Sequence, residues 1–171
     1  MAICALAFLG VGAVGATAAG KPARTLAAAD QLEGGVLVEL NAIRRSHGLH
    51  PVRLSQPLSA AADAHSRSMG RYGYFEHESR DGSAFWKRVQ RFYGSESYGT
   101  WSVGENLLWS TGDVDASHAL ELWMKSPAHR ANILTARWRE VGLSAVSVPG
   151  APGVYGGRDV VIITTDFGVR S

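Results

Sequence analysis

The segment VGENLLW, residues 103–109, sets a glutamate and an asparagine inside a short run of valine, leucine and tryptophan. Residues 103–110 are rich in strand-favouring side chains, so they predict a strand or extended segment that ends at the turn beginning at Thr111. A carboxylate beside so much apolar surface is expected to be partly buried and to need a partner. Glu105 is therefore the first candidate for a functional side chain.

Two histidines lie in similar surroundings. His77 follows the aromatic residues of YGYFE, 72–76, and His129 follows LWMKSPA, 122–128. Two imidazoles and one carboxylate are the smallest set that makes a metal site with open coordination positions, and zinc suits such ligands best. Because 28 and 24 residues separate His77, Glu105 and His129, their spacing does not show that they converge. Three independent surface groups remain the alternative.

The composition is that of one soluble globular domain. The chain has 171 residues, of which 46% are hydrophobic and 19% charged, and this length suffices for one core without disulfides or metals. The net charge is +2, with acids and bases interspersed and no basic stripe interleaved with aromatics. Nucleic-acid binding therefore has little support.

The N-terminal residues, 1–19, are expected to form a secretory signal peptide. Residues 2–19 are small and apolar and give way to Lys21, which predicts cleavage near Ala18. No basic residue precedes the apolar run, so an uncleaved membrane anchor, or a true start other than Met1, remains open. Cys4 is the only cysteine, so a processed chain would have no thiol nucleophile or cysteine metal site. The expected location is the cell exterior.

The chain after residue 19 predicts an α+β domain. Residues 20–31 are interpreted as an unpatterned linker and residues 32–171 as the domain. Helical spacing predicts helices near 32–48, 55–71, 85–94, 115–126 and 127–134. The β-branched runs 141–148 and 159–165 flank a glycine-rich connection and predict an antiparallel hairpin. His65 falls on the apolar face of the second helix and is expected to be a core histidine bonded to a backbone carbonyl.

Several motifs, taken in order, resemble the CAP superfamily of cysteine-rich secretory, antigen-5 and pathogenesis-related proteins, in its bacterial branch without disulfides. The motifs are YFEH (74–77), GENL (104–107), LWMKSPAHRANIL (122–134), VG (141–142) and DFG (166–168). The resemblance covers about residues 35–168. It implies an α-β-α sandwich with a small central antiparallel sheet, and a cleft into which His77, Glu105 and His129 project.

The resemblance also implies which residues line the cleft and where this chain departs from its relatives. Asn106, Ser126, Arg130 and Asn132 are expected at the cleft. Ser126 is interpreted first as a helix cap. The alternative for Asn132 is a hydrogen bond to the backbone. Many relatives have a second glutamate at the position that matches Ser126. Its absence weakens the case for a metal, since one anionic ligand or orienting group is missing. Glu121 lies nearby but is expected to face solvent.

Three functions are compatible with these residues. The first is a secreted, non-catalytic CAP module whose cleft binds zinc or another divalent cation, a small ligand, a lipid or a cell-envelope component. The second is a zinc-assisted hydrolase of peptide or cell-wall amide bonds, with His77 and His129 as ligands and Glu105 as general base. The third is a purely structural hydrogen-bonded network. No activated nucleophile is evident, which favours the first, and removal of the signal peptide would leave no membrane span.

Overall fold

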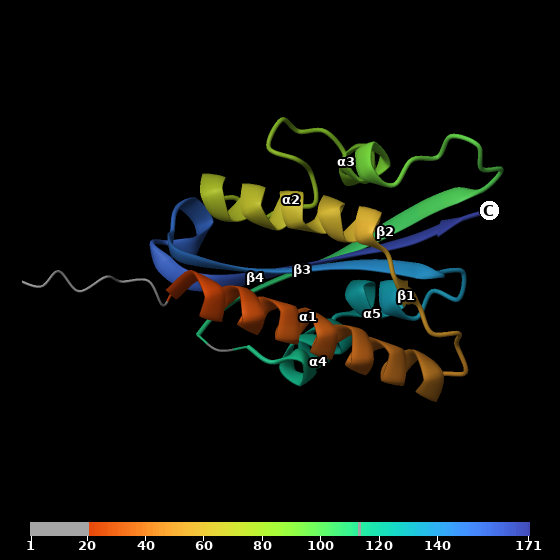
Figure 1. The fold of residues 1–171 in the computed structure, drawn as a ribbon, viewed down its shortest axis with the longest axis horizontal. Helices are drawn as coiled ribbons and strands as arrows, with labels where there is room; N and C mark the ends of the chain where they lie inside the picture. The colour runs from red at the N-terminus through yellow and green to blue at the C-terminus, as the bar shows by residue number, and fades with distance from the viewer. Residues whose placement is uncertain (1–20, 113) are drawn as a thin grey trace, which may run out of the picture.

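The protein is a three-layer sandwich, with a four-stranded sheet between two layers of helices (Figure 1). The computed structural model describes residues 21–112 and 114–171, so the predicted signal peptide lies outside the described residues. One face of the sheet is covered by α2 (Gln56–Tyr72) and α3 (Phe85–Phe92). The opposite face is covered by α1 (Lys21–Ser46), α4 (Ala116–Lys125) and α5 (Pro127–Ile133). The expected α-β-α sandwich is confirmed.

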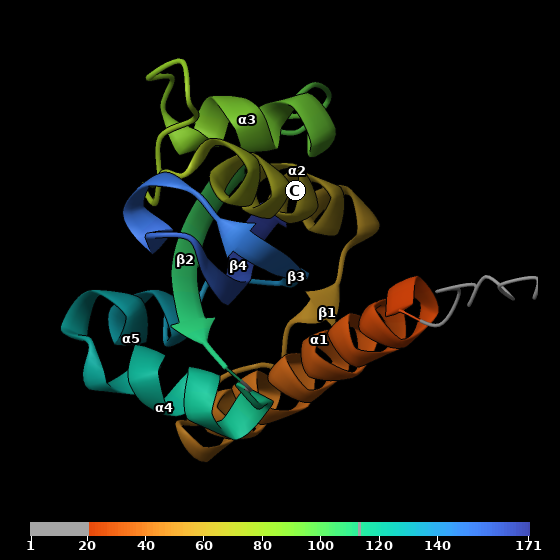
Figure 2. The ribbon, with the colours of Figure 1, turned by 90° about the vertical axis from the view of Figure 1, so that its left-hand side faces the viewer.

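The sheet has the strand order β1-β3-β4-β2. Its members are β1 (Arg53–Leu54), β2 (Trp101–Thr111), β3 (Glu140–Ala151) and β4 (Arg158–Arg170). The three long strands pair antiparallel, whereas the two-residue β1 pairs parallel with β3. The expected central antiparallel sheet is therefore present, with the short parallel strand β1 added at one edge. β2 forms the opposite edge of the sheet, where Figure 2 shows it between α3 and α5.

The predicted hairpin is present, and its strands are longer than their β-branched runs. A turn of 3-10 helix, Gly153–Tyr155, lies in the connection between β3 and β4. β4 continues to Arg170 because it pairs with β3 on one side and β2 on the other. The segment DFG, residues 166–168, therefore lies in the centre of the sheet.

Apolar side chains fill both interfaces between the sheet and the helices. Toward α1, α4 and α5 the core contains buried leucine, tryptophan and isoleucine side chains, among them Leu40, Trp123 and Ile133. On the α2 and α3 side the buried side chains include Met69, Ile162, Leu58, Val89 and Tyr93. Burying one such side chain stabilises the fold by about 1.5–3 kcal/mol.

Helix α2 packs directly on β3 and sets the position of the loop that follows it. A Cβ added at Gly142 of β3 would overlap the backbone of Leu58 and Ser59, so the helix can approach this closely only at a glycine. The helix ends at Gly73, whose φ of 71° lies in the left-handed region and whose N–H donates to the carbonyl of Met69. The loop 74–84, which carries His77, starts from this point.

Two expectations about helices need correction. α1 begins at Lys21, so residues 21–31 are helical and do not form an unpatterned linker. Ser126 occupies the N-cap position of α5, but its side chain makes no capping hydrogen bond. By contrast, Asp115 caps α4 by accepting from the backbone N–H of His118 at 2.8 Å. None of the helices over residues 21–112 and 114–171 is both long and apolar enough to cross a membrane.

Candidate functional site

The edge strand β2 directs two neighbouring polar side chains to opposite faces of the sheet. Successive side chains of a strand alternate between faces. The Glu105 side chain accordingly bonds to residues of the α2–α3 side, and that of Asn106 to residues of α5. Both side chains are buried. The GEN motif thus places polar groups on both sides of one exposed sheet edge.

Glu105 is held by two basic groups. It is 7% exposed, and its Oε2 pairs with the Arg88 guanidinium. Its Oε1 lies 2.8 Å from Nδ1 of His77. A buried carboxylate with a charged partner and a second hydrogen bond is satisfied on both oxygens. The predicted convergence of His77 and Glu105 is therefore present.

Arg88 completes this group and was not among the predicted site residues. It lies on α3, and its Nη1 donates to the carbonyl of His77 at 3.2 Å and to Oγ of Ser79 at 3.4 Å. One guanidinium therefore ties the loop that carries His77 to the edge strand that carries Glu105. The sequence did contain a signal: Arg88 is three residues after Phe85 and four before Phe92, which places a cation on the apolar stripe of α3.

A second carboxyl group, that of Asp166, lies beside Glu105. Asp166 faces Glu105 across the β2–β4 ladder and is fully buried. Burial, reinforced by the negative charge of Glu105, raises the pKa of Asp166 well above its ordinary value. Protonation of Asp166 is therefore favoured, and a protonated acid can lie beside the Glu105 carboxylate without adding a second negative charge.

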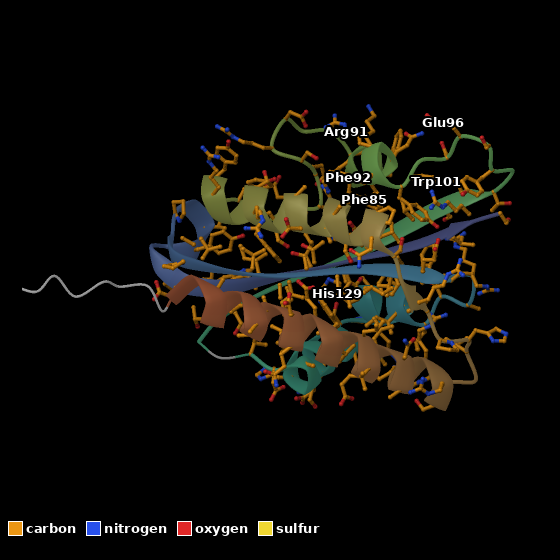
Figure 3. All side chains as sticks on the ribbon, viewed as in Figure 1. Phe85, Arg91, Phe92, Glu96, Trp101 and His129 are labelled. Carbon is orange, nitrogen blue, oxygen red and sulfur yellow. The ribbon has the colours of Figure 1, made fainter. Side chains whose placement is uncertain are left out.

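On the opposite face, Asn106 and Asn132 hold α5 against β2. Nδ2 of Asn106 donates to the carbonyl of His129 at 3.2 Å, and Nδ2 of Asn132 donates to Oδ1 of Asn106 at 3.0 Å. Gly104 permits this approach, because an added Cβ would press against the Asn132 amide. The first turn of α5, with His129, is thereby fixed at the sheet edge (Figure 3).

The pKa values of the two histidines are shifted in opposite directions. The hydrogen bond to Glu105 raises the pKa of His77, whose side chain is 47% exposed. Burial, together with the charge of His77, lowers the pKa of His129. The two histidines approach β2 from opposite faces, His77 in the loop 74–84 and His129 in the first turn of α5. We call His77, Arg88, Glu105 and His129 the β2-edge site.

These residues fit a divalent cation only in part. Nδ1 of His77 is taken by Glu105, which leaves Nε2 as its metal donor, with Glu105 as the group that orients the ring. The Glu105 carboxylate is already paired with Arg88. Within residues 21–112 and 114–171, no three His, Cys, Asp or Glu side chains are arranged to hold one ion. The three-ligand set is not formed in this arrangement, and metal binding stays a prediction based on two imidazoles.

The other singled-out residues lie in different surroundings. Ser126 is half-buried at the start of α5. Arg130 is exposed and lines a separate surface depression with Met124 and Pro127. Glu121 faces solvent and pairs with Lys125, as expected. His65 is buried, and its Nε2 lies 2.9 Å from the Glu76 carbonyl, which confirms it as a core histidine.

Comparison with known sequences places these observations in a family. Residues 37–161 match the model of CAP, the cysteine-rich secretory protein family. The chain is 36% identical over 112 residues to the uncharacterised protein YkwD of Bacillus subtilis, a match that covers 64% of this chain and 41% of YkwD. It is 30% identical over 111 residues to the uncharacterised membrane protein YlbC of the same organism. This match covers 65% of this chain and 30% of YlbC. The chain thus spans less than half the length of these relatives.

Solved structures share the fold. An extracellular protein of Bacillus anthracis that contains an SCP domain is 25% identical, with a TM-score of 0.65 over 86% of this chain and 43% of that one. An outer surface protein of Borrelia burgdorferi is 16% identical, with a TM-score of 0.62 over 80% of this chain and 90% of that one. Both neighbours are extracellular or surface proteins. The second likeness is one of fold alone.

Proposed function

Because the chain belongs to the CAP family of cysteine-rich secretory proteins, we propose that it is a non-catalytic binding module of the cell exterior, which recognises a cell-envelope component through the β2-edge site. The extracellular neighbour from Bacillus anthracis supports the location. The apolar N-terminal segment, interpreted as a signal peptide, supports it as well.

The observation that carries the non-catalytic assignment is the pairing of Glu105. A general base must lie within reach of the proton that it takes, and a neighbouring cation makes a carboxylate a weaker base. Here one oxygen of Glu105 contacts Arg88 and the other contacts His77. The acid is also buried, so this geometry favours a carboxylate that orients His77 over one that activates water. The hydrolase therefore has less support than the binding module.

The recognition chemistry resides in the two imidazoles. Because the pKa of His77 is raised and that of His129 is lowered, His77 takes up a proton more readily than His129 near the ordinary imidazole value of about 6.5. The first donates a charge-assisted hydrogen bond, and the second both donates and accepts. Acidic or carbonyl-bearing groups of a cell-wall polymer suit this pair.

Cosedimentation with purified Bacillus peptidoglycan tests the proposal. The wild-type protein is expected to bind, and the double variant His77→Ala, His129→Ala to lose most of that binding. The matched control is His50→Ala, His118→Ala, which removes two exposed histidines outside the site and should bind like the wild type. Equal losses in both variants, or no binding by the wild type, would overturn the proposal.

The same samples test the hydrolase alternative. Reducing ends and free amines released into the supernatant are measured with and without added zinc. The binding module releases neither. Release that disappears in Glu105→Gln would instead identify a hydrolase with Glu105 as its base.

A further inference from the structure

A cavity of about 630 Å³ lies between α2, α3 and the loop 74–84, beside the β2-edge site, with which it shares only Arg88. We call it the α2–α3 cavity. It includes Arg88 but not His77, Glu105 or His129, and its volume lies in the range typical of small-ligand sites. Figure 3 shows Arg91 and Phe92 on α3 at this side of the molecule. The lining residues named below come from α2, α3 and the loop between them.

Two of the lining side chains are buried and have unused hydrogen-bonding atoms. His65 is 1% exposed and Arg88 is 6% exposed. Nε2 of His65 faces a carbonyl and must carry the ring proton, so Nδ1 is a free acceptor. Within residues 21–112 and 114–171, neither Nδ1 of His65 nor Nε of Arg88 has a hydrogen-bond partner. Buried polar atoms without partners are rare; both atoms are closed to solvent here, so they form a polar wall behind the cavity and do not themselves contact its contents.

The rim of the cavity carries more positive than negative charge, with two arginines, Arg80 and Arg91, and one acid, Asp81. Among the residues that the structure describes, Arg80 and Arg91 form no ion pair. Arg80 stacks on the ring of Tyr72, with its guanidinium carbon 3.9 Å from the ring centroid, which holds the planar guanidinium in place. The acid of the rim, Asp81, accepts the backbone N–H of Ser83 at 3.0 Å instead. The cavity is therefore suited to an anion.

The rest of the lining combines aromatic rings with hydroxyl groups. The rings of Tyr72 and Phe92 are exposed, and each presents flat apolar surface. The hydroxyls of Ser68 and Tyr74 are 2.8 Å apart and leave further lone pairs free. A fatty-acyl chain requires a continuous apolar lining, which the polar groups interrupt here. A sugar ring, with one apolar face and a rim of hydroxyls, matches the alternation of rings and polar groups.

We propose that the α2–α3 cavity binds an anionic saccharide, a sugar ring that carries a carboxylate or a phosphate. Arg80 and Arg91 bind the anion, Tyr72 and Phe92 pack on the ring, and the hydroxyls of Ser68 and Tyr74 bond to its hydroxyls. This site is separate from the recognition proposed for the β2-edge site, since neither histidine of that site lines the cavity. Either site can fail without the other.

NMR titration of the ¹⁵N-labelled protein tests the inference with defined probes. A galacturonate trisaccharide supplies the carboxylate and glucose 6-phosphate supplies the phosphate; maltotriose is the neutral sugar, and octanoate is the anion with an acyl chain. At least one acidic sugar is expected to shift the amides of residues 64–92 with a Kd near or below about 1 mM, a range that probe concentrations of about 10 mM saturate. Maltotriose should bind at least about ten-fold more weakly, because it lacks the charge-assisted contacts.

Matched variants separate specific contacts from general charge. The double variant Arg80→Gln, Arg91→Gln removes two exposed cations from the cavity. It should bind the acidic sugar about ten-fold more weakly, or weaker still. The control Arg45→Gln, Arg137→Gln removes the same charge elsewhere, and Arg137 also lies over an aromatic ring, at 5.0 Å from the Trp138 centroid. The control should bind like the wild type.

Four outcomes overturn the inference: no shifts with either acidic sugar, equal binding of maltotriose, equal weakening in the control variant, or tighter binding of octanoate than of both acidic sugars. Shifts confined to the amides near His129 would also overturn it, because they would assign the sugar to the β2-edge site.

Discussion

Glu105 brings a negative charge into a buried site, and Arg88 is the cation that neutralises it. Replacing Arg88 by methionine should destabilise the fold by about 3–5 kcal/mol, because an unpaired buried carboxylate remains. The double variant Arg88→Met, Glu105→Gln should recover part of that loss. Urea unfolding of both single variants and the double variant measures the coupling.

The exposed pair Arg67 and Asp63 provides the control for this cycle. Arg67→Met should cost less than about 1 kcal/mol, as is usual for exposed ion pairs. If Arg88→Met were no more costly than Arg67→Met, the buried pair would not contribute as described.

His65 should make stability fall in acid. Burial lowers its pKa in the folded state from 6.5 to about 4. Below pH 6.5, His65 therefore binds a proton in the unfolded chain but not in the folded protein. The free energy of unfolding consequently decreases as the pH falls from 6.5 toward 4. Over this window the loss is up to about 3 kcal/mol, at about 1.4 kcal/mol per pH unit.

The variant His65→Gln isolates this effect. Glutamine does not titrate, whereas Asp166, His77 and His129 titrate in both proteins, so the difference between the two pH profiles belongs to His65. Urea unfolding at intervals between pH 4 and 7 should give a flatter profile for the variant. Parallel profiles would mean that His65 is protonated in the folded protein as readily as in the unfolded chain.

Single residues were predicted where local pattern determines their surroundings. His65 lies on an apolar helical face, and Glu105 lies inside an apolar run, so burial and a need for partners followed from sequence. The identity of the partners did not follow. Arg88 reaches Glu105 through the packing of α3 on the sheet. From sequence alone, the guanidinium of an arginine on an amphipathic helix could equally extend into solvent or form a buried ion pair.

Among the elements, the contact between α2 and β3 has the least tolerance for change. Gly142→Ala would place a methyl group into the backbone of Leu58 and Ser59, so it should destabilise the protein by about 2 kcal/mol or more. Gly34→Ala is the control: Gly34 lies inside α1 with open space around it, and alanine there should stabilise by about 0.5–1 kcal/mol. Thermal unfolding distinguishes the two, and equal melting temperatures would contradict the close approach.

Elements were predictable to the extent that one sequence feature defined them. Periodicity located the later helices, and β-branched runs located β3 and β4. The start of α1 was missed because residues 21–31 are rich in alanine, which favours helix without any apolar period. The additional length of β4 was missed because its last residues are strand through pairing with β2 and β3, which local sequence does not encode.

At the scale of the whole molecule, the β2-edge site exists because the two helical layers meet at one sheet edge. His77 comes from the layer of α2 and α3, and His129 from the layer of α4 and α5. The strand order that leaves β2 at the edge could not be derived from spacing, since local pattern does not fix which strands become neighbours. The family resemblance, and not periodicity, predicted that these residues approach one another.

Zinc binding at this edge should depend on pH in a way that reveals the role of Glu105. A ligating imidazole must be neutral, and the hydrogen bond to Glu105 raises the pKa of His77. As the pH is lowered, protonation of His77 should therefore begin to reduce the zinc affinity while the pH is still above the ordinary imidazole value of about 6.5. Glu105→Gln removes that charge, so the midpoint of the pH dependence of zinc affinity should move to lower pH. At high pH the variant should bind zinc about 10–100-fold more weakly, because the His77 ring is less well oriented. Calorimetric titration with zinc between about pH 5 and pH 9 measures both effects, with Glu121→Gln, at an exposed position, as the control.

Complete loss of zinc binding in Glu105→Gln at every pH would make Glu105 a direct ligand. An unchanged midpoint would mean that the charge of Glu105 does not act on His77.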